Sequence, residues 1–398
     1  MNRWHMLGVG MAAQAAGCMF LYGLPFLVPE LRAETGWSLA RLGVLVGCPS
    51  IGMLLALVAW GAAADRYGER LVMAWGLGTS AVFLIAGAFT TGPVALGVLL
   101  VLAGIAGASV SAASGRVVLG WFPPERRGFA MGWRQAAQPL SVAFAALLLP
   151  PVAGHSGVRG ALLVLAGICL LVTAAITLIL ADPPDASPAP GAEPGAGPQP
   201  RTGAPYRQGA LWRVHGASAV LIVPQFAVSV FALEYLVSDR HLTAPGAGRL
   251  LAVAGLVGAA TRLLAGRWSD RLGSRLRPMR WLAFAATGAI GLLALAAGLH
   301  SPAGTALVLV AVVVTLSWNG LAFTSVAEQA GPAWAGRAFG IQNTVQNLSV
   351  AVTPALWGAL IAGYGFGAGY AVAAVVPLLG ALVTPREPAR HAAPVTTP

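Results

Sequence analysis

Long apolar stretches, separated by short polar segments, recur along the whole chain. Each stretch is roughly 20 residues long, the length of an α-helix that crosses the hydrocarbon layer of a membrane. No alternation of apolar and polar residues is visible, so a barrel of membrane-spanning strands is not expected. The pattern predicts twelve membrane helices, near residues 6–29, 41–63, 71–90, 93–119, 128–151, 159–180, 211–236, 247–265, 281–299, 303–327, 337–361 and 366–384.

A polar segment divides these helices into two sets of six. Residues 181–210 are rich in Pro, Ala and Gly and cannot bury a core, so we expect a disordered cytoplasmic linker there. The predicted fold is an all-α membrane protein of two pseudo-symmetric six-helix bundles. These bundles comprise residues 1–180 and 211–384, and residues 385–398 form a cytoplasmic tail.

The two halves carry matching segments. GAAADRYGER begins at Gly61 and GRWSDRLGSR begins at Gly266, an offset of 205 residues. A second match, QPLSVA from Gln138 against QNLSVA from Gln346, has an offset of 208 residues. Two independent matches at nearly one offset indicate that the whole six-helix half is duplicated, which is typical of secondary transporters.

Composition supports a membrane location. The chain is 57% hydrophobic and 9% charged, whereas soluble domains average about 25% charged residues. The net charge of +11 comes from arginine alone, because the chain has no lysine. We place 16 of the 24 arginines on one side of the membrane, five on the other and three within helices. This bias puts both termini in the cytoplasm of a cell-membrane protein. Because membrane topology explains the positive net charge, we expect no nucleic-acid partner.

Other chemistries find no support in the sequence. Cys18, Cys48 and Cys169 lie in apolar stretches and suggest no disulfide framework. The six histidines lie at helix ends and tails, so no metal set is expected. A nucleotide-binding G-x-x-x-x-G-K-[ST] loop is absent, which argues against ATP-driven transport. We therefore expect neither an enzyme nor a cofactor.

The duplicated charged segment resembles the G-x-x-x-D-R-x-G-R-[RK] loop of the major facilitator superfamily. Glu69 and Leu71 depart from the basic cluster of that loop. The resemblance implies a monomeric carrier in the lipid bilayer, which exposes a central small-molecule site alternately to each side by rocking of the halves. The matching residues are Asp65, Arg66, Gly68 and Arg70 in the first half and Asp270, Arg271, Gly273 and Arg275 in the second.

Finer likeness points to one branch, the monocarboxylate, oxalate/formate and nitrate-type carriers. Gly36-Trp37-Ser38 resembles its GWS segment, and residues 121–132 resemble its aromatic and basic entry to the fifth helix. The drug-exporter pattern G-P-x-x-G-G is absent from that helix. We therefore favour a small organic or inorganic anion, such as a monocarboxylate, as substrate. A proton-coupled exporter of drug-like compounds and a non-transporting membrane sensor stay open as alternatives.

Arg262 is the leading candidate for binding an anion. It lies eight residues before Asp270, similar to a substrate-binding arginine in helix 8 of that branch. A charge inside the hydrocarbon is costly and usually faces a cavity or a partner, and a guanidinium can hold a carboxylate by two hydrogen bonds. Alternatively, Arg262 reaches the inner surface or pairs with Glu328. Further candidates, each of which could instead make a structural contact between helices, are Arg134, Gln138, Gln342, Gln346, Asn319 and Tyr22.

The matched charged segments predict a gate. Asp65 and Asp270 each lie at an inner turn, where the N-terminal end of a neighbouring helix would stabilise an anion. We expect them to hold the cytoplasmic side closed, together with Arg66, Arg70, Arg271 and Arg275; an ordinary charged turn that only sets topology is the alternative.

Proton coupling has weaker candidates. No carboxylate lies clearly at mid-membrane, and Glu234 near an outer helix end is the best available. Its alternative is a solvated helix end. Arg116 resembles the helix 4 arginine that the family sometimes uses in coupling, but its shallow position near the cytoplasmic helix end favours a structural pair with Asp65 or Glu125. Coupling could also be absent, or the substrate could carry the proton.

Overall fold

The structure is a computed structural model. It describes residues 3–121, 124–181, 206, 209–330 and 335–385, and excludes the side chains of residues 3, 65, 115–120, 124–136 and 335–337. Three predicted site residues, Asp65, Arg116 and Arg134, therefore have side chains outside the described part of the chain. Most of the expected linker and all but one residue of the expected tail lie outside it as well.

Helices make up the described chain, and no strand occurs in it. The first half contains α1 (Arg3–Gly23), the 3-10 turn η1 (Leu24–Leu27), α2 (Val28–Thr35), α3 (Leu39–Tyr67), α4 (Glu69–Ala88), α5 (Pro93–Trp121) and α6 (Pro124–Ile179). The second half contains α7 (Ala210–Glu234), the π-helical turn η3 (Tyr235–Asp239), α8 (Ala244–Leu272), α9 (Leu276–Gly298), α10 (Gly304–Leu316), α11 (Asn319–Ala330) and α12 (Ala335–Val383).

Two of these helices are each long enough for two membrane crossings. The described chain has ten apolar helical stretches of spanning length, and those in α6 and α12 run for 43 and 46 residues. A bilayer needs only about 20. Gly157 interrupts α6 with a φ of 67°, and Gly365 interrupts α12 with a φ of 80°. Glycine tolerates such angles because it has no Cβ, and the two breaks yield the twelve expected spans.

The backbone repeats the register that the sequence matches predict. Gly365 follows Gly157 by 208 residues, and Gly273 follows Gly68 by 205, each with positive φ. Ser38 and Thr243, also 205 residues apart, are both N-caps, and their hydroxyls accept from backbone N–H groups three residues on. The duplication therefore extends from sequence to helix breaks and caps.

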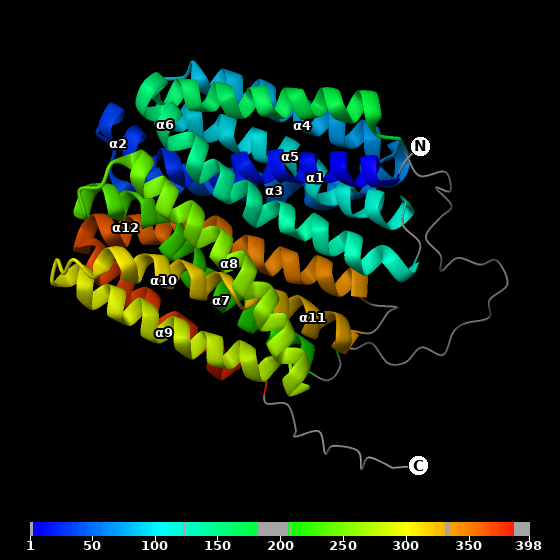
Figure 1. Ribbon diagram of the computed structural model, residues 1–398. Coiled ribbons are helices and arrows are strands. Elements are labelled where there is room, and N and C mark those ends of the chain that lie inside the picture. Colours follow the sequence, from blue (N-terminus) through cyan, green and yellow to red (C-terminus); the bar gives the residue numbers. More distant parts are fainter. Residues whose placement is uncertain (1–2, 122–123, 182–205, 207–208, 331–334, 386–398) are drawn as a thin grey trace, which may run out of the picture.

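Figure 1 shows the two bundles lying side by side, with the helices running along a common direction. The breaks at Gly157 and Gly365 lie at one end of the molecule, because Val158 bonds to Glu34 of α2, Phe366 contacts Tyr235 of η3, and α2 is joined to Glu234 beside Tyr235. We name this end the Gly157 end. The opposite end carries the turns after α3 and α8, at Gly68 and Gly273, and we name it the arginine-rich end. Arg66, Arg70, Arg267, Arg271, Arg275 and Arg277 lie there.

The halves approach each other closely toward the Gly157 end. A Cβ at Gly43 of α3 would lie 2.1 Å from the carbonyl oxygen of Pro354 in α12. A Cβ at Gly248 of α8 would lie 2.2 Å from the carbonyl oxygen of Ala146 in α6. Such distances require glycine, because they are shorter than van der Waals contact. Backbone contacts therefore close this end of the interface.

Large apolar side chains point outward from the bundles. Leu55, Val58 and Leu178 are 69%, 83% and 83% exposed. An apolar surface of this extent is unfavourable in water, whereas it is as apolar as the lipid chains of a membrane. The exterior is thus built for the hydrocarbon layer, while Phe20, Leu77 and other residues that are fully buried fill the bundles.

Candidate functional site

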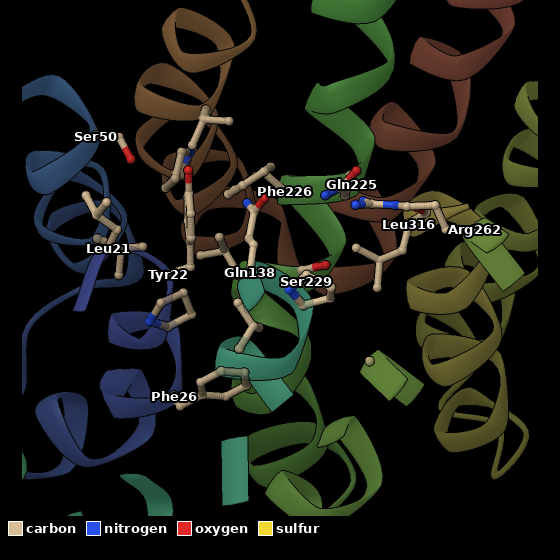
Figure 2. A pocket seen from close by; sticks show the side chains of 18 residues that line it. Leu21, Tyr22, Phe26, Ser50, Gln138, Gln225, Phe226, Ser229, Arg262 and Leu316 are labelled. Atoms are coloured by element: carbon tan, nitrogen blue, oxygen red, sulfur yellow. The ribbon is translucent and has the colours of Figure 1, made fainter. Parts of the chain in front are cut away.

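A cavity of about 100 Å³ lies between the two halves. Helices α1, α3 and α6 of the first half line it together with α7, α8, α10 and α12 of the second. Its size suits a small solute, since about 10–15 Å³ of such space already admits one water. The polar lining residues are Tyr22, Ser50, Gln138, Gln225, Ser229 and Arg262 (Figure 2).

Arg262 of α8 reaches the cavity without a carboxylate partner among the described residues. Its Nε donates to the carbonyl oxygen of Leu316, 3.2 Å away, at the end of α10. Among the described residues Arg262 makes no ion pair with Glu328, which instead accepts from Nε of Arg275 at 3.0 Å. Figure 2 shows the guanidinium end of Arg262 directed toward Gln225. The charge is thus placed in the cavity wall, and its terminal nitrogens make no hydrogen bond to the described residues.

Gln225 adds a second polar group with unmet hydrogen-bonding capacity. This residue of α7 is 8% exposed, and its Oε1 has no hydrogen-bond partner in the described part of the chain. A buried acceptor without a donor costs about 1–3 kcal/mol, so its presence favours a role in binding. Sequence reasoning missed Gln225, Ser50 and Ser229. The signal for Gln225 was available, since it is an amide inside an otherwise apolar helix.

The other end of the cavity is aromatic. Tyr22 at the end of α1 and Phe226 of α7 lie with ring centroids 5.8 Å apart and an interplanar angle of 60°. Phe26 of η1 also lines the cavity, apart from these two rings (Figure 2). The two halves therefore meet at an aromatic contact, and the cavity combines a cationic end with an apolar end.

Three predicted residues make contacts between helices instead. Gln346 donates through Nε2 to Oδ1 of Asn319 at 3.0 Å, which joins α12 to α11. Oε1 of Gln342 lies 2.6 Å from Nδ1 of His215, which joins α12 to α7. Tyr206 lies on the other side of the His215 ring, with its hydroxyl 3.1 Å from Nε2. Gln342, Gln346 and Asn319 are not among the residues that line the cavity.

The gate residues at the arginine-rich end make contacts within their own halves. Arg275 donates to Asp270 and Glu328, and to Oγ of Ser269 at 2.6 Å, which joins α8, α9 and α11. Partial burial alone would lower the pKa of Arg275, but the hydrogen bonds with Asp270 and Glu328 raise it above its usual value. Arg70 donates to the carbonyl oxygen of Thr177.

The remaining gate residues lie close to these contacts. The guanidinium carbon of Arg66 lies 5.4 Å from the ring centre of Tyr67, and the Arg271 side chain is exposed. Gly68 and Gly273 end α3 and α8. These helix ends run past the predicted boundaries, so Arg66, Asp270 and Arg271 lie on a last helical turn rather than in a loop. The apolar pattern stops at the hydrocarbon edge, whereas hydrogen bonding continues the helix beyond it.

Glu234 is buried at the Gly157 end of α7 and is not a solvated helix end. It is 2% exposed, and its Oε1 lies 2.5 Å from Nη1 of Arg32 in α2. Arg32 belongs to the first half and Glu234 to the second, so this ion pair bridges the interface. Sequence reasoning identified the carboxylate but not its partner, which is 202 residues away.

Comparison with known proteins agrees with this architecture. The model of the Major Facilitator Superfamily matches residues 10–354. An uncharacterized MFS-type transporter of Mycobacterium tuberculosis is 38% identical over 383 residues, covering 96% of this chain and 85% of the relative. A probable anion transporter 4 from Arabidopsis thaliana chloroplasts is 32% identical over 34% of this chain and 25% of its own. The hexuronate transporter of Bacillus subtilis is 27% identical over 33% of this chain and 31% of its own.

A solved structure shares the fold. The bacterial homolog of the human lysosomal transporter Spinster superimposes with a TM-score of 0.81 and covers 96% of both chains. Its sequence is 14% identical, so this likeness concerns the fold alone.

Proposed function

The chain belongs to the Major Facilitator Superfamily and is a transporter of that type, and we propose that it is a secondary carrier of a small organic anion. The observation that carries the proposal is Arg262, a cation in the cavity wall without a carboxylate partner among the described residues. Among the partial relatives, one is named an anion transporter and another a hexuronate transporter. Their names support an anionic substrate for this chain.

In the proposed complex, Arg262 binds the carboxylate of the substrate. Its Nε already donates to Leu316, so the two terminal nitrogens are the donors available to the anion. A guanidinium presents such donors in a fixed plane that fits carboxylate oxygens. Gln225 and Gln138 bind neighbouring polar atoms, while Tyr22 and Phe226 enclose the apolar part of the substrate.

Alternating access follows from the contacts at the two ends. We propose that the Gly157 end faces the outside and the arginine-rich end faces the cytoplasm, as the arginine distribution favours. The glycine contacts of α3 and α8 and the Arg32–Glu234 pair then close the outer side. Opening must break that pair, so Glu234 is the candidate for a co-transported proton.

The gate at the cytoplasmic side is assigned to the duplicated residues. We propose that the Asp270–Arg275–Glu328 contacts hold the inner ends of α8, α9 and α11 as one body during rocking. Asp65, with Arg66 and Arg70, has the equivalent role in the first half. Arg116 and Arg134 remain candidates for coupling and substrate binding by the same reasoning from sequence.

A second function has one observation in its favour. The cavity is lined largely by apolar side chains, including Leu21, Val46, Val142 and Val350. Such a lining also suits an exporter of drug-like compounds, which would tolerate loss of Arg262. The sensor alternative is set aside, because the chain is a transporter.

Thermal stabilisation of purified protein by small anions tests the proposal. A ligand that binds only the folded state stabilises it by about 2.7 kcal/mol at 100 times its Kd. We expect an organic monoanion to raise the Tm of wild type and not that of Arg262→Ala. Stabilisation of both proteins by hydrophobic compounds, with no response to anions, would favour the exporter.

A further inference from the structure

One face of α9 is exposed along the whole helix. Trp281, Phe284, Leu292, Leu295 and Leu299 lie three or four residues apart or at multiples of that spacing, and they are 50%, 44%, 56%, 63% and 78% exposed. At about 1.5 Å per residue the face is roughly 27 Å long, close to the hydrocarbon thickness of about 30 Å. This face therefore contacts lipid chains, and Trp281 marks its boundary at the arginine-rich end.

Trp281 is paired with a tryptophan of the neighbouring helix. The rings of Trp268 in α8 and Trp281 in α9 have centroids 5.3 Å apart and an interplanar angle of 31°. Both remain exposed, at 38% and 50%. Tryptophan prefers the level of the lipid headgroups, so the pair forms an aromatic surface across α8 and α9 at that level.

Four arginines lie within four residues of the tryptophan pair along α8 and α9, without a carboxylate partner among the described residues. Arg277 and Arg280 precede Trp281 by four residues and one residue, and Arg267 and Arg271 flank Trp268 on α8. The nearby acids Asp270 and Glu328 are both bound by Arg275. The positive charge of this surface is therefore not neutralised by the described protein groups.

Arg280 supplies an independent sign of a missing anionic partner. Its Nε is buried and finds no acceptor among the residues that the structure describes. A buried donor of a charged group that lacks a partner is costly, so the charge of Arg280 is not compensated by the described protein groups. The side chain as a whole is partly exposed, and this exposed part is open to a phosphate oxygen from the membrane. Phosphate is bound well by arginine because its oxygens match the planar donors.

We propose that Trp268, Trp281, Arg277 and Arg280 form a binding site for an anionic phospholipid in the leaflet at the arginine-rich end. The headgroup phosphate is bound by the two arginines, and the upper acyl chains lie against the tryptophan rings and Phe284. A zwitterionic lipid has the same phosphate but less net charge, so the site discriminates by charge. The site uses only the second half.

The duplication supports a dedicated role. At the 205-residue offset, the counterparts of Trp268 and Trp281 are Ala63 and Gly76, and the counterpart of Arg280 is Trp75. The matched part of the scaffold therefore does not require these residues. Their presence in one half alone indicates a function specific to α8 and α9.

Native mass spectrometry of the full-length protein tests the site. The protein in detergent is given equal amounts of phosphatidylglycerol and phosphatidylcholine, and retained lipids are counted. We expect wild type to retain phosphatidylglycerol preferentially, and the double variant Arg277→Gln/Arg280→Gln to bind it roughly tenfold more weakly, since each arginine near an anionic lipid contributes measurably. Arg249→Gln, which removes an exposed arginine from the other end of α8, is the matched control.

Two results would overturn the proposal. One is equal retention of the two lipids by wild type. The other is an unchanged preference in the double variant, whose folding is checked by its Tm in phosphatidylcholine. A Trp268→Leu/Trp281→Leu variant tests the aromatic part of the site separately, because it keeps all arginines. This variant should retain less phosphatidylglycerol than wild type but should still prefer it to phosphatidylcholine.

Discussion

Arg32 and Glu234 form the one ion pair that joins the two halves within the described part of the chain, with Nη1 2.5 Å from Oε1. The pair is asymmetric, because the glutamate is 2% exposed and the arginine 45%. Removing the arginine leaves a buried carboxylate alone, whereas removing both charges leaves nothing unpaired. We therefore expect closure of the Gly157 end to depend on the charges of these two residues.

The first prediction uses that asymmetry. Arg32→Gln should lower stability by about 1–3 kcal/mol, less than the usual loss for a buried pair because water screens the exposed arginine. The double variant Arg32→Gln/Glu234→Gln should recover most of that loss. The Tm of the three proteins at one pH checks this. Equal destabilisation by the single and double variants would show that the carboxylate is compensated by other groups.

Close packing of α3 on α12 gives a second prediction. A Cβ at Gly43 would lie 2.1 Å from a backbone oxygen, so Gly43→Ala should prevent closure of the Gly157 end and reduce transport at least roughly tenfold. Gly167→Ala in α6 is the control, since nothing lies within 4 Å of its Cβ and the residue is in no predicted site. Uptake into proteoliposomes measures both variants. Full activity of Gly43→Ala would argue against this contact in the transport cycle.

Gln225 should show opposite effects on stability and affinity. Gln225→Leu removes a buried acceptor that lacks a partner and should stabilise the protein by about 1 kcal/mol. If the amide binds substrate, the same change should raise KM several-fold, a trade between stability and function. Thermal unfolding and transport kinetics on one preparation test the two effects together. An unchanged KM would assign Gln225 to packing.

The contacts of Arg275 should matter for transport more than for stability. Exposed ion pairs contribute about 0–1 kcal/mol each, so Arg275→Gln should change the Tm little. Turnover should nevertheless fall if the inner ends of α8, α9 and α11 must move as one body. Arg249→Gln serves as the control for loss of one positive charge on the same half. Equal turnover of wild type and Arg275→Gln would leave the gate without support.

The fold was largely predictable because its signals are local and repeated. Apolar runs placed the helices within several residues, and the matched segments at Gly61 and Gly266 indicated the duplication. Helix ends such as Arg66 and Asp270 were harder, since the helices continue past the hydrocarbon. Near Gly157 the sequence predicts only a loop, because hydropathy does not specify the positive φ of the residue that breaks the helix.

The site was predictable in part. Arg262, Gln138 and Tyr22 stood out as polar groups in apolar helices, and the structure brings them to one cavity. Gln342 and Gln346 carry the same signal but bind His215 and Asn319. Which amide faces a cavity and which a neighbouring helix depends on packing between distant segments, and a single sequence does not specify that.

Transport of an anion by wild type and Arg262 variants tests the central claim most directly. Proteoliposomes containing wild type, Arg262→Ala or Arg262→Lys are given the labelled monoanion that best stabilises the wild type. The account predicts uptake by wild type, loss of at least roughly tenfold in Arg262→Ala, and partial recovery in Arg262→Lys, which keeps the charge but not the two-pronged geometry. Uptake by Arg262→Ala at the wild-type rate would contradict it.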